Sequence, residues 1–344
     1  MRIDEIPTPA PIIDIDALDR NLELMAGRLP GQTLRPHVKA HKCTALAARQ
    51  SAHGHTSFTC ATPREVIGMM EAGVGDELLL ANQVVDVTRL RAISNAREQS
   101  GALVHVAVDS TETIDAAAQG GITHVVIDVE VGMPRCGVRP EHAAALADYA
   151  RRAGLEISGV MGYEGHLQMV TDVAEKEAKV ADAMRQLRQA HDDVGGAIVS
   201  AGGTGTHTFH HIGLDHPTGV TDVQAGSYAL LDTQYATLQQ GFEQALIILG
   251  TVISTTARRC VADVGLKSLG MDHGNPTIAD HSVWFCSDEH ITFSSADEAP
   301  RAKVGDRVAV TPAHIDPTLA MHPVAWVVRD GEVIDRWEID LRYW

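Results

Sequence analysis

Short runs of β-forming residues alternate with alanine-rich segments from about residue 30 onward. Apolar residues recur at helical spacing in these segments, and Pro63 and Pro140 stand where a proline suits the first turn of a helix. The pattern predicts strands over 33–38, 57–60, 77–81, 104–108, 124–129, 157–161, 197–201 and 221–224, and helices over 44–51, 63–71, 141–153 and 173–191. Eight βα units predict a closed parallel barrel rather than an open sheet.

The pattern changes after about residue 240. Apolar runs at 245–254, 283–286, 307–311 and 324–329 are separated by turns and show little helical periodicity. Asp330-Gly331 follows the last run and is a strong hairpin signal, because both residues suit a type I′ turn. We therefore expect an α/β protein with a (β/α)8 TIM barrel over 20–240. A mainly-β domain is expected over 241–344 together with 1–19, joined by an N-terminal strand at 11–15.

Composition narrows the class of function. Hydrophobic residues make up 44% of the chain, as in globular proteins, and 28 basic residues against 45 acidic ones give a net charge of −17. This charge argues against nucleic acids and anionic membranes as partners. We see no apolar stretch long enough to span a bilayer and no signal-peptide core. Five scattered cysteines without Cys-x-x-Cys spacing favour a reducing compartment, so we expect a cytoplasmic protein.

The segment 36–42, Pro-His-Val-Lys-Ala-His-Lys, carries the most informative chemistry. It ends the first predicted strand, and barrel enzymes place their chemistry where strands end and βα loops begin. A lysine there could hold an aldehyde cofactor as a Schiff base, since burial or neighbouring cations lower the pKa of a lysine amine. A solvated basic stretch is the alternative for an isolated lysine pair. We interpret Lys39 as the nucleophile, with Lys42 as supporting charge.

Two glycine-containing loops predict a phosphate site. They follow the seventh and eighth predicted strands, where such barrels commonly bind phosphate. Exposed N–H groups and hydroxyls can bind a dianion, and glycine lets the backbone approach it closely. Each loop alone could be an ordinary turn. Together with Lys39 they predict pyridoxal 5′-phosphate (PLP), bound by Gly203, Thr204, Gly226, Ser227 and Tyr228.

Three further residues follow the fifth and sixth predicted strands. His166 lies beside Tyr163 and could stack on the cofactor ring or act as a base. Arg135 could orient oxygens of the cofactor or the substrate, although a structural ion pair is a close alternative. Gln224 ends the eighth predicted strand, where its neutral amide could meet the pyridine nitrogen and leave it unprotonated.

A possible metal site lies in the β-rich part of the chain. His314 and Asp316 stand two residues apart in Pro-Ala-His-Ile-Asp-Pro-Thr, and in an extended segment such residues face the same side. Imidazole with carboxylate suits Mn²⁺, Mg²⁺, Co²⁺ or Zn²⁺, whereas a thiolate in place of the carboxylate would indicate zinc. A His-x-Asp pair alone is usually structural, so this assignment needs support from elsewhere in the chain.

That support comes from a resemblance that covers nearly the whole chain. The chain resembles the D-threonine aldolase and D-serine dehydratase family, PLP enzymes of the alanine-racemase-like fold. The resemblance implies that Lys39 carries the cofactor and His314 binds a metal, and Asp316 resembles the aldolase branch, because dehydratases have His-x-Cys there. The motifs that carry it lie at 7–9, 35–42, 81–84, 106–109, 132–137, 162–168, 202–206, 224–228, 263–267, 287–290 and 312–318.

The expected reaction is retro-aldol cleavage of a D-3-hydroxy-amino acid, such as D-threonine, to glycine and an aldehyde. The metal, with Mn²⁺ first among the candidates, is expected to lower the pKa of the substrate's hydroxyl. Either His166 or a metal-bound water would remove the proton. The main alternative is dehydration of D-serine or 3-hydroxyaspartate; an amino-acid racemase and a non-catalytic PLP carrier are weaker alternatives. A homodimer is expected by analogy with the fold.

Overall fold

A computed structural model of the 344-residue chain describes residues 1–213, 215, 216, 218–295 and 302–343. The chain forms two compact units. We call Met25–Lys39, Leu46–Gly226 and Leu341–Trp344 the barrel unit, and Met1–Leu24, Ala40–Ala45 and Ser227–Asp340 the β unit. Along the described parts of the chain, no helix combines the length and apolar character needed to cross a membrane.

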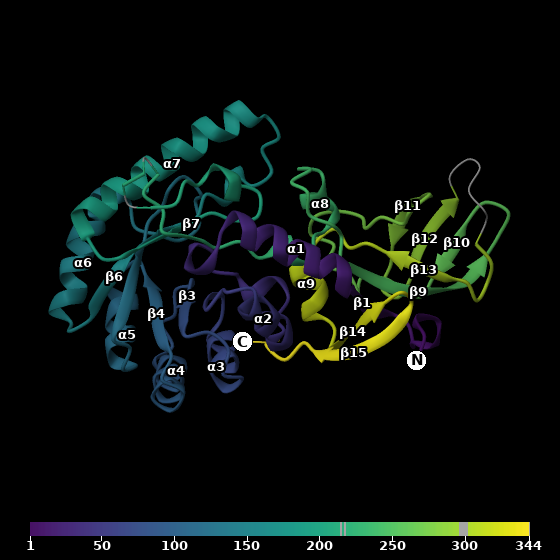
Figure 1. Ribbon diagram of the computed structural model, residues 1–344, viewed down its shortest axis with the longest axis horizontal. Coiled ribbons are helices and arrows are strands. Elements are labelled where there is room, and N and C mark those ends of the chain that lie inside the picture. The colour runs from purple at the N-terminus through teal and green to yellow at the C-terminus, as the bar shows by residue number, and fades with distance from the viewer. Residues whose placement is uncertain (214, 217, 296–301, 344) are drawn as a thin grey trace. The chain divides into compact units, whose positions relative to one another are not determined.

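The barrel unit is built on seven parallel strands in sequential order (Figure 1). Most residues of these strands are buried, as expected when a parallel sheet is covered on both faces. The strands are β2 (Ser57–Cys60), β3 (Glu77–Leu80), β4 (Leu103–Val108), β5 (His124–Asp128), β6 (Glu156–Gly162), β7 (Ile198–Ala201) and β8 (Asp222–Val223). All seven coincide with predicted strands, although β8 has only two of the four expected residues.

The first predicted strand, 33–38, is irregular. Short 3₁₀ turns, η2 (Gly31–Thr33) and η3 (Val38–Ala40), flank it, and only Leu34 and His37 form parallel bridges, to Val223 and Thr59. Pro36 explains the interruption, because proline has no N–H group to donate to a ladder. Its carbonyl accepts a hydrogen bond from Thr59, and the bridges on either side close the sheet into a ring. The barrel prediction is confirmed, with an irregular eighth position.

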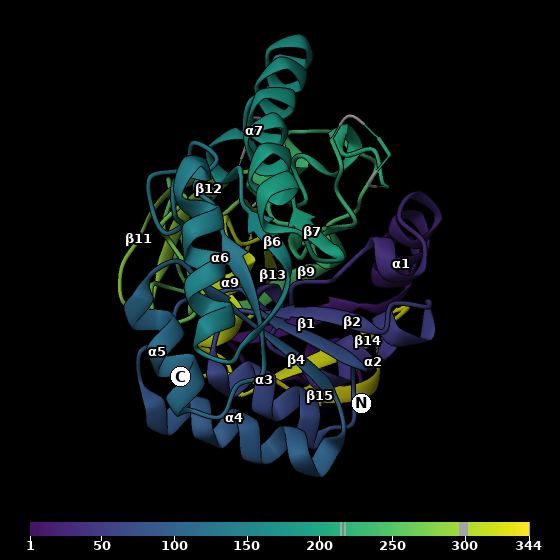
Figure 2. The same ribbon diagram turned by 90° about the vertical axis from the view of Figure 1, so that its left-hand side faces the viewer.

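Helices α3 to α7 pack in succession around the outside of the parallel sheet (Figure 2). Pro63 opens α3 directly after the cap Thr62, whose side chain accepts from the Glu65 N–H, as the sequence predicts. Pro140 instead opens a 3₁₀ turn, η4 (Pro140–His142), that leads into α6. The helices are α2 (Thr44–Ala52), α3 (Pro63–Glu71), α4 (Val87–Ser100), α5 (Thr111–Gln119), α6 (Ala143–Arg152) and α7 (Val173–Val194).

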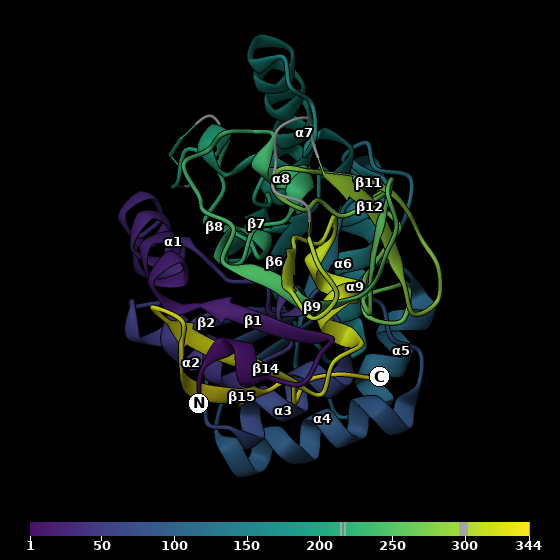
Figure 3. The same ribbon diagram turned by 90° about the vertical axis from the view of Figure 1, so that its right-hand side faces the viewer.

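The β unit contains an eight-stranded sheet with β1 near its centre (Figure 3). β1 pairs in parallel with β14 and antiparallel with β9, so the expected N-terminal strand does join the C-terminal strands. The strands are β1 (Ala10–Asp14), β9 (Leu246–Thr255), β10 (Cys260–Ala262), β11 (His281–Cys286), β12 (Ile291–Ser295), β13 (Arg307–Val310), β14 (Val324–Arg329) and β15 (Glu332–Glu338), with helices α1 (Ile15–Arg28, whose last residues belong to the barrel unit), α8 (Thr233–Ala236) and α9 (Ile315–Ala320).

The predicted hairpin joins β14 to β15. Arg329 pairs with Glu332, and the two residues between them have positive φ, 49° at Asp330 and 78° at Gly331. Both values match a type I′ turn, so this prediction is confirmed. The core of the unit gathers apolar residues from β9, β10 and β12, among them Ile248, Val252 and Phe293.

Candidate active site

Lys39 lies at the rim of the barrel where the strands end. It is exposed, although its neighbours Val38 and Ala40 are 0% and 1% exposed. The backbone before it is fixed, because the His37 N–H donates to the Ala225 carbonyl and the Lys39 N–H donates to Nδ1 of His37. The chain therefore projects one long amine from a rigid, buried segment, as a Schiff-base lysine requires.

The loops after β5 and β6 bring three predicted site residues together. The guanidinium of Arg135 lies 5.6 Å from the ring centroid of Tyr163. His166, in the short turn η5 (Gly165–Leu167), packs against Gly132, where a Cβ would come within 3.0 Å of the imidazole. Gly132 also has φ +115°, so a side chain there would be strained and would displace His166.

The loop after β7, residues 202–206, is held by hydrogen bonds within the protein. The N–H groups of Gly202, Gly203 and Gly205 donate to Glu164, Thr206 and Gln168 respectively. A predicted phosphate donor, the Gly203 N–H, is therefore already engaged. The sequence motif around Tyr163 and His166 thus contains two further residues, Glu164 and Gln168, that support this loop.

Buried charged side chains also hold the loop 202–206 in place. Glu164 is fully buried and accepts from Nε2 of His210 at 3.0 Å. Burial raises the pKa of Glu164, but the His210 charge and the hydrogen bonds outweigh it and hold the pKa below its ordinary value. Lys176, 4% exposed, donates from Nζ to the carbonyls of Gln168 and Gly205, each at 3.0 Å. Lys176 lies within α7, and no motif in the sequence distinguishes it.

The loop after β8 offers main-chain donors. In the described parts of the chain, the N–H groups of Gly226 and Ser227 have no acceptor, and Ser227 begins the short turn η7 (Ser227–Ala229). Such groups suit a phosphate dianion. Tyr228 is 0% exposed, and its ring packs 5.7 Å from that of Phe242 in the β unit.

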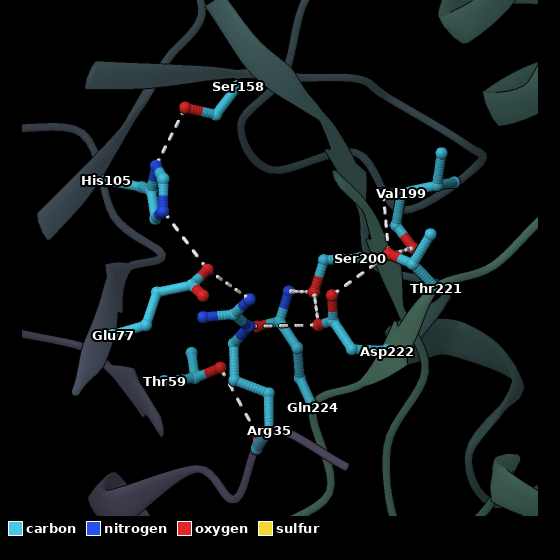
Figure 4. A network of polar contacts seen from close by, with 10 residues as sticks. All are labelled: Arg35, Thr59, Glu77, His105, Ser158, Val199, Ser200, Thr221, Asp222 and Gln224. Atoms are coloured by element: carbon cyan, nitrogen blue, oxygen red, sulfur yellow. Dashed lines mark hydrogen bonds and ion pairs between the residues drawn. The ribbon is translucent and has the colours of Figure 1, made fainter. Parts of the chain in front are cut away.

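A buried polar network links Gln224 to the interior of the barrel unit (Figure 4). Nε2 of Gln224 donates to Oγ of Ser200 at 2.9 Å, and that hydroxyl donates to Oδ1 of Asp222 at 2.5 Å. Arg35, 3% exposed, donates from Nε to the same Asp222 oxygen at 3.1 Å and from Nη2 to Glu77 at 2.7 Å.

Glu77 is ionised within this network. Burial raises its pKa, but the approach of His105 Nε2 to 3.1 Å and the Arg35 charge outweigh burial and lower the pKa to about 2. Beyond Glu77, Nδ1 of His105 lies 2.8 Å from the Ser158 hydroxyl. Arg35 therefore has ion pairs with two carboxylates, as a buried guanidinium requires.

The predicted metal pair lies in the β unit. Nε2 of His314 faces Oδ1 of Asp316 at 3.9 Å. The expected extended conformation is wrong beyond His314, because His314 caps α9 and Asp316 lies in the first helical turn. The pair still comes together at the start of this helix. Nitrogen and carboxylate oxygen donors at this separation fit one divalent ion after a small approach of the side chains.

Two residues that the sequence did not indicate adjoin His314. Oδ2 of Asp272 lies 2.7 Å from Nδ1 of His314, and the His273 ring stacks on the His314 ring at 3.9 Å. Asp272, His273 and His314 form a group of possible metal ligands within 4.8 Å of one another. Asp272 lies 42 residues before His314, so their contact depends on the tertiary fold.

The buried carboxyl of Asp128, at the rim of the barrel unit, predicts that the stability of the protein depends on pH. It ends β5, is 5% exposed and accepts a hydrogen bond from Gln83. Burial raises its pKa, and the charge of Asp109 adds to this effect, to about 6 from an ordinary 3.8. The folded state favours the protonated acid, so ionisation of Asp128 lowers the free energy of unfolding. This loss of stability is absent below pH 4, grows as the pH rises through 6, and reaches about 3 kcal/mol.

We therefore expect Asp128→Asn to raise the thermal midpoint of the apoprotein by roughly 5 °C at pH 8. Little gain is expected at pH 4, where the wild-type carboxyl is already neutral. Calorimetry at both pH values measures the difference, and Asp148→Asn on the exposed surface of α6 is the control. An equal gain at both pH values would show that ionisation of Asp128 is not the cause.

Together, a parallel barrel with a lysine at its rim and a mainly-β second unit define an alanine-racemase-like fold. Residues 13–233 match the family model "Alanine racemase, N-terminal domain", and residues 245–328 match "Putative serine dehydratase domain". The first match spans more than half of the chain. The protein therefore belongs to the alanine-racemase-like family of PLP-dependent enzymes.

Particular relatives are similar over almost the full length. A D-threonine aldolase from Arthrobacter sp. is 32% identical, with 98% of this chain and 93% of the relative covered. A 3-hydroxy-D-aspartate aldolase from Paracoccus denitrificans (strain Pd 1222) is 30% identical, covering 98% and 92%. The crystal structure of D-threonine aldolase from Filomicrobium marinum superimposes with a TM-score of 0.90 at 32% identity, covering 98% and 96%.

The residues of this chain fit the family's cofactor. PLP needs an amine for its aldehyde and donors for its phosphate. Lys39 offers an exposed amine on a buried segment, and the N–H groups of Gly226 and Ser227 await an acceptor within the described residues. The resemblance inferred from the sequence motifs is thereby confirmed at the level of the family and its cofactor.

Proposed function

We propose that this protein is a lyase that cleaves a D-3-hydroxy-amino acid to glycine and an aldehyde, with PLP and a divalent metal ion as cofactors. The observation that carries the proposal is the full-length similarity to enzymes named as aldolases of D-threonine and 3-hydroxy-D-aspartate. Asp316 supports the same assignment, since the resemblance associates a carboxylate at this position with the aldolase branch.

Lys39 has the central role in binding the cofactor. Its amine would form the covalent linkage, while Thr204, Gly226, Ser227 and Tyr228 would hold the phosphate end. Gly203, whose N–H is given to Thr206, would contribute by letting the backbone approach the phosphate closely. Arg135 and Tyr163, whose side chains lie together, orient oxygens of the cofactor or of the substrate carboxylate. When bound, PLP supplies an electron sink for the pair released as the Cα–Cβ bond breaks.

His314 and Asp316 are the proposed metal ligands. A mixed nitrogen and oxygen donor set without sulfur suits Mn²⁺ first, with Mg²⁺, Co²⁺ and Zn²⁺ as alternatives. A divalent ion held there supplies a Lewis acid that lowers the pKa of the substrate's β-hydroxyl. His166 is the proposed base that accepts the hydroxyl proton, because it is exposed at the rim and its ring is positioned against Gly132.

A product assay tests the proposal. The purified protein, loaded with PLP and Mn²⁺, is offered D-threonine, L-threonine, D-serine and D-3-hydroxyaspartate. We expect glycine and an aldehyde from D-substrates alone, and the relative rates on D-threonine and D-3-hydroxyaspartate then define the preferred side chain. Ammonia and a keto acid would instead assign the chain to the dehydratases.

Asp272 is expected to position His314 for the metal. A carboxylate that accepts from Nδ1 fixes the tautomer in which Nε2 is available to the ion, and losing such a partner commonly costs 10- to 100-fold in metal affinity. We therefore expect Asp272→Asn to weaken Mn²⁺ binding by about 10-fold, measured by calorimetric titration. Asp330→Asn, in the turn between β14 and β15 and outside this group of possible ligands, is the control. Unchanged affinity in Asp272→Asn would exclude this role.

The assembly and the location of the protein complete the proposal. A homodimer is expected by analogy with the fold, and analytical ultracentrifugation tests it. The acidic charge and the scattered cysteines support a cytoplasmic enzyme whose partner is a small amino acid rather than a nucleic acid or a membrane.

A further inference from the structure

The orientation of the Gln224 side chain follows from the groups around it. An amide can present either its N–H or its carbonyl to a neighbour, and the two ends look nearly alike in shape. Which end faces a pyridine nitrogen matters: an N–H stabilises the unprotonated ring, whereas a carbonyl requires a protonated one. The surrounding hydrogen bonds must therefore determine the choice.

Chemistry determines which group donates in each hydrogen bond of this network (Figure 4). Arg35 can only donate, and it donates to Oδ1 of Asp222. That ion pair keeps Asp222 as an acceptor, so the Ser200 hydroxyl uses its one hydrogen on the same oxygen at 2.5 Å. The Ser200 oxygen can then only accept from Gln224, and the amide nitrogen is the only end of the Gln224 side chain that donates.

Burial makes this arrangement rigid. Ser200 and Asp222 are 0% and 3% exposed, and Thr221 donates to the second Asp222 oxygen at 3.1 Å. The backbone of Gln224 is also fixed, because its N–H donates to the Ala201 carbonyl. Gln224 itself is only half-buried, at the carboxyl end of β8. Its amide nitrogen carries two hydrogens, and Ser200 takes one.

We propose that Ser200 and Asp222 are positioning residues that fix the Gln224 amide so that its second N–H faces the pyridine nitrogen of PLP. The inference rests on the proposed function, in which Gln224 meets that nitrogen. A neutral ring is a weaker electron sink than a protonated one. The network thereby sets an electronic property of the cofactor through residues that do not touch it.

The test uses holoenzyme reconstituted with PLP labelled with ¹⁵N in the ring, because protonated and unprotonated pyridine nitrogens differ clearly in ¹⁵N chemical shift. In the wild type we expect the unprotonated shift from pH 6 to 9. In Ser200→Ala we expect a shift toward the protonated value at the acidic end, since the released amide can turn its carbonyl to the ring. Cofactor retention should weaken roughly 2- to 10-fold, as for loss of one neutral hydrogen bond.

Ser158→Ala is the matched control. It also removes a serine hydroxyl from the network, at the His105 end, but the hydroxyl removed has no contact with Gln224. We expect the wild-type shift and wild-type retention. Gln224→Glu is a second probe that does not depend on Ser200, and a carboxylate there should give a protonated ring.

The possible results distinguish a failure of this inference from a failure of the proposed function. Wild-type holoenzyme with the cofactor on Lys39, but with the same ¹⁵N shift in Ser200→Ala and Ser158→Ala, would overturn this inference alone. An unchanged shift in Gln224→Glu would do the same. A wild-type protein that retains no PLP on Lys39 after borohydride reduction and peptide mapping would overturn the proposed function and this inference with it.

Discussion

Replacing Lys39 with alanine is expected to abolish covalent attachment of PLP and to lower activity by roughly 10³-fold or more, because the positioned nucleophile is lost. The substitution removes an exposed side chain from a backbone that its neighbours already hold, so the fold should persist. Borohydride reduction of the loaded protein followed by mass spectrometry measures the linkage directly.

Lys42 provides the matched control for this experiment. It lies three residues further along the same motif and is intermediate in burial. We expect Lys42→Ala to keep the covalent cofactor, with at most a modest change in its affinity. A reduced cofactor found on Lys42 in the wild type, or a linkage that survives in Lys39→Ala, would contradict the assignment of the Schiff-base lysine.

The strands of the barrel unit were predictable because each is a short, nearly continuous apolar run between helical segments. The residues of β3 illustrate this, since Leu78, Leu79 and Leu80 are all 0% exposed. The first strand was overpredicted, because apolar character alone does not register that Pro36 cannot donate to a ladder. In the β unit, β10 and β12 were missed, since they are short and depend on pairing with each other and with β9. The strand β15 was indicated only through the hairpin signal, because it is mostly polar.

The residues of the candidate site also fall into two groups, those that the local sequence indicates and those that it does not. Lys39 and His314 belong to local motifs, so the sequence alone could indicate them. The residues that support the site come from far along the chain, as in Arg35 with Asp222, 187 residues apart, and Glu164 with His210, 46 residues apart. Such contacts arise from tertiary packing, and a single sequence carries no signal for them. The conformation of Asp316 was misjudged for a local reason, because α9 begins directly after His314.

Removal of the metal is expected to cost at least about 10²-fold in activity, the several kcal/mol that a Lewis acid contributes to charge development on the substrate oxygen. Exhaustive treatment with EDTA should cause this loss, and Mn²⁺ should reverse it. His314→Ala should show the same loss without recovery, while borohydride still traps PLP on Lys39. These two readouts separate metal binding from cofactor binding.

Asp316→Cys gives the sharper version of this test, because it changes the chemistry of one ligand and leaves His314 in place. A thiolate is a softer donor than a carboxylate, so the preference of the site should move from Mn²⁺ toward Zn²⁺. Competition of the two ions for the apoprotein, followed by calorimetry, measures that change. Asp330→Asn, in the turn of the β14–β15 hairpin, is the control. An unaltered ion preference in Asp316→Cys would exclude Asp316 as a ligand and would favour the Asp272, His273 and His314 group instead. Full activity after exhaustive EDTA treatment would exclude the catalytic role of a metal altogether.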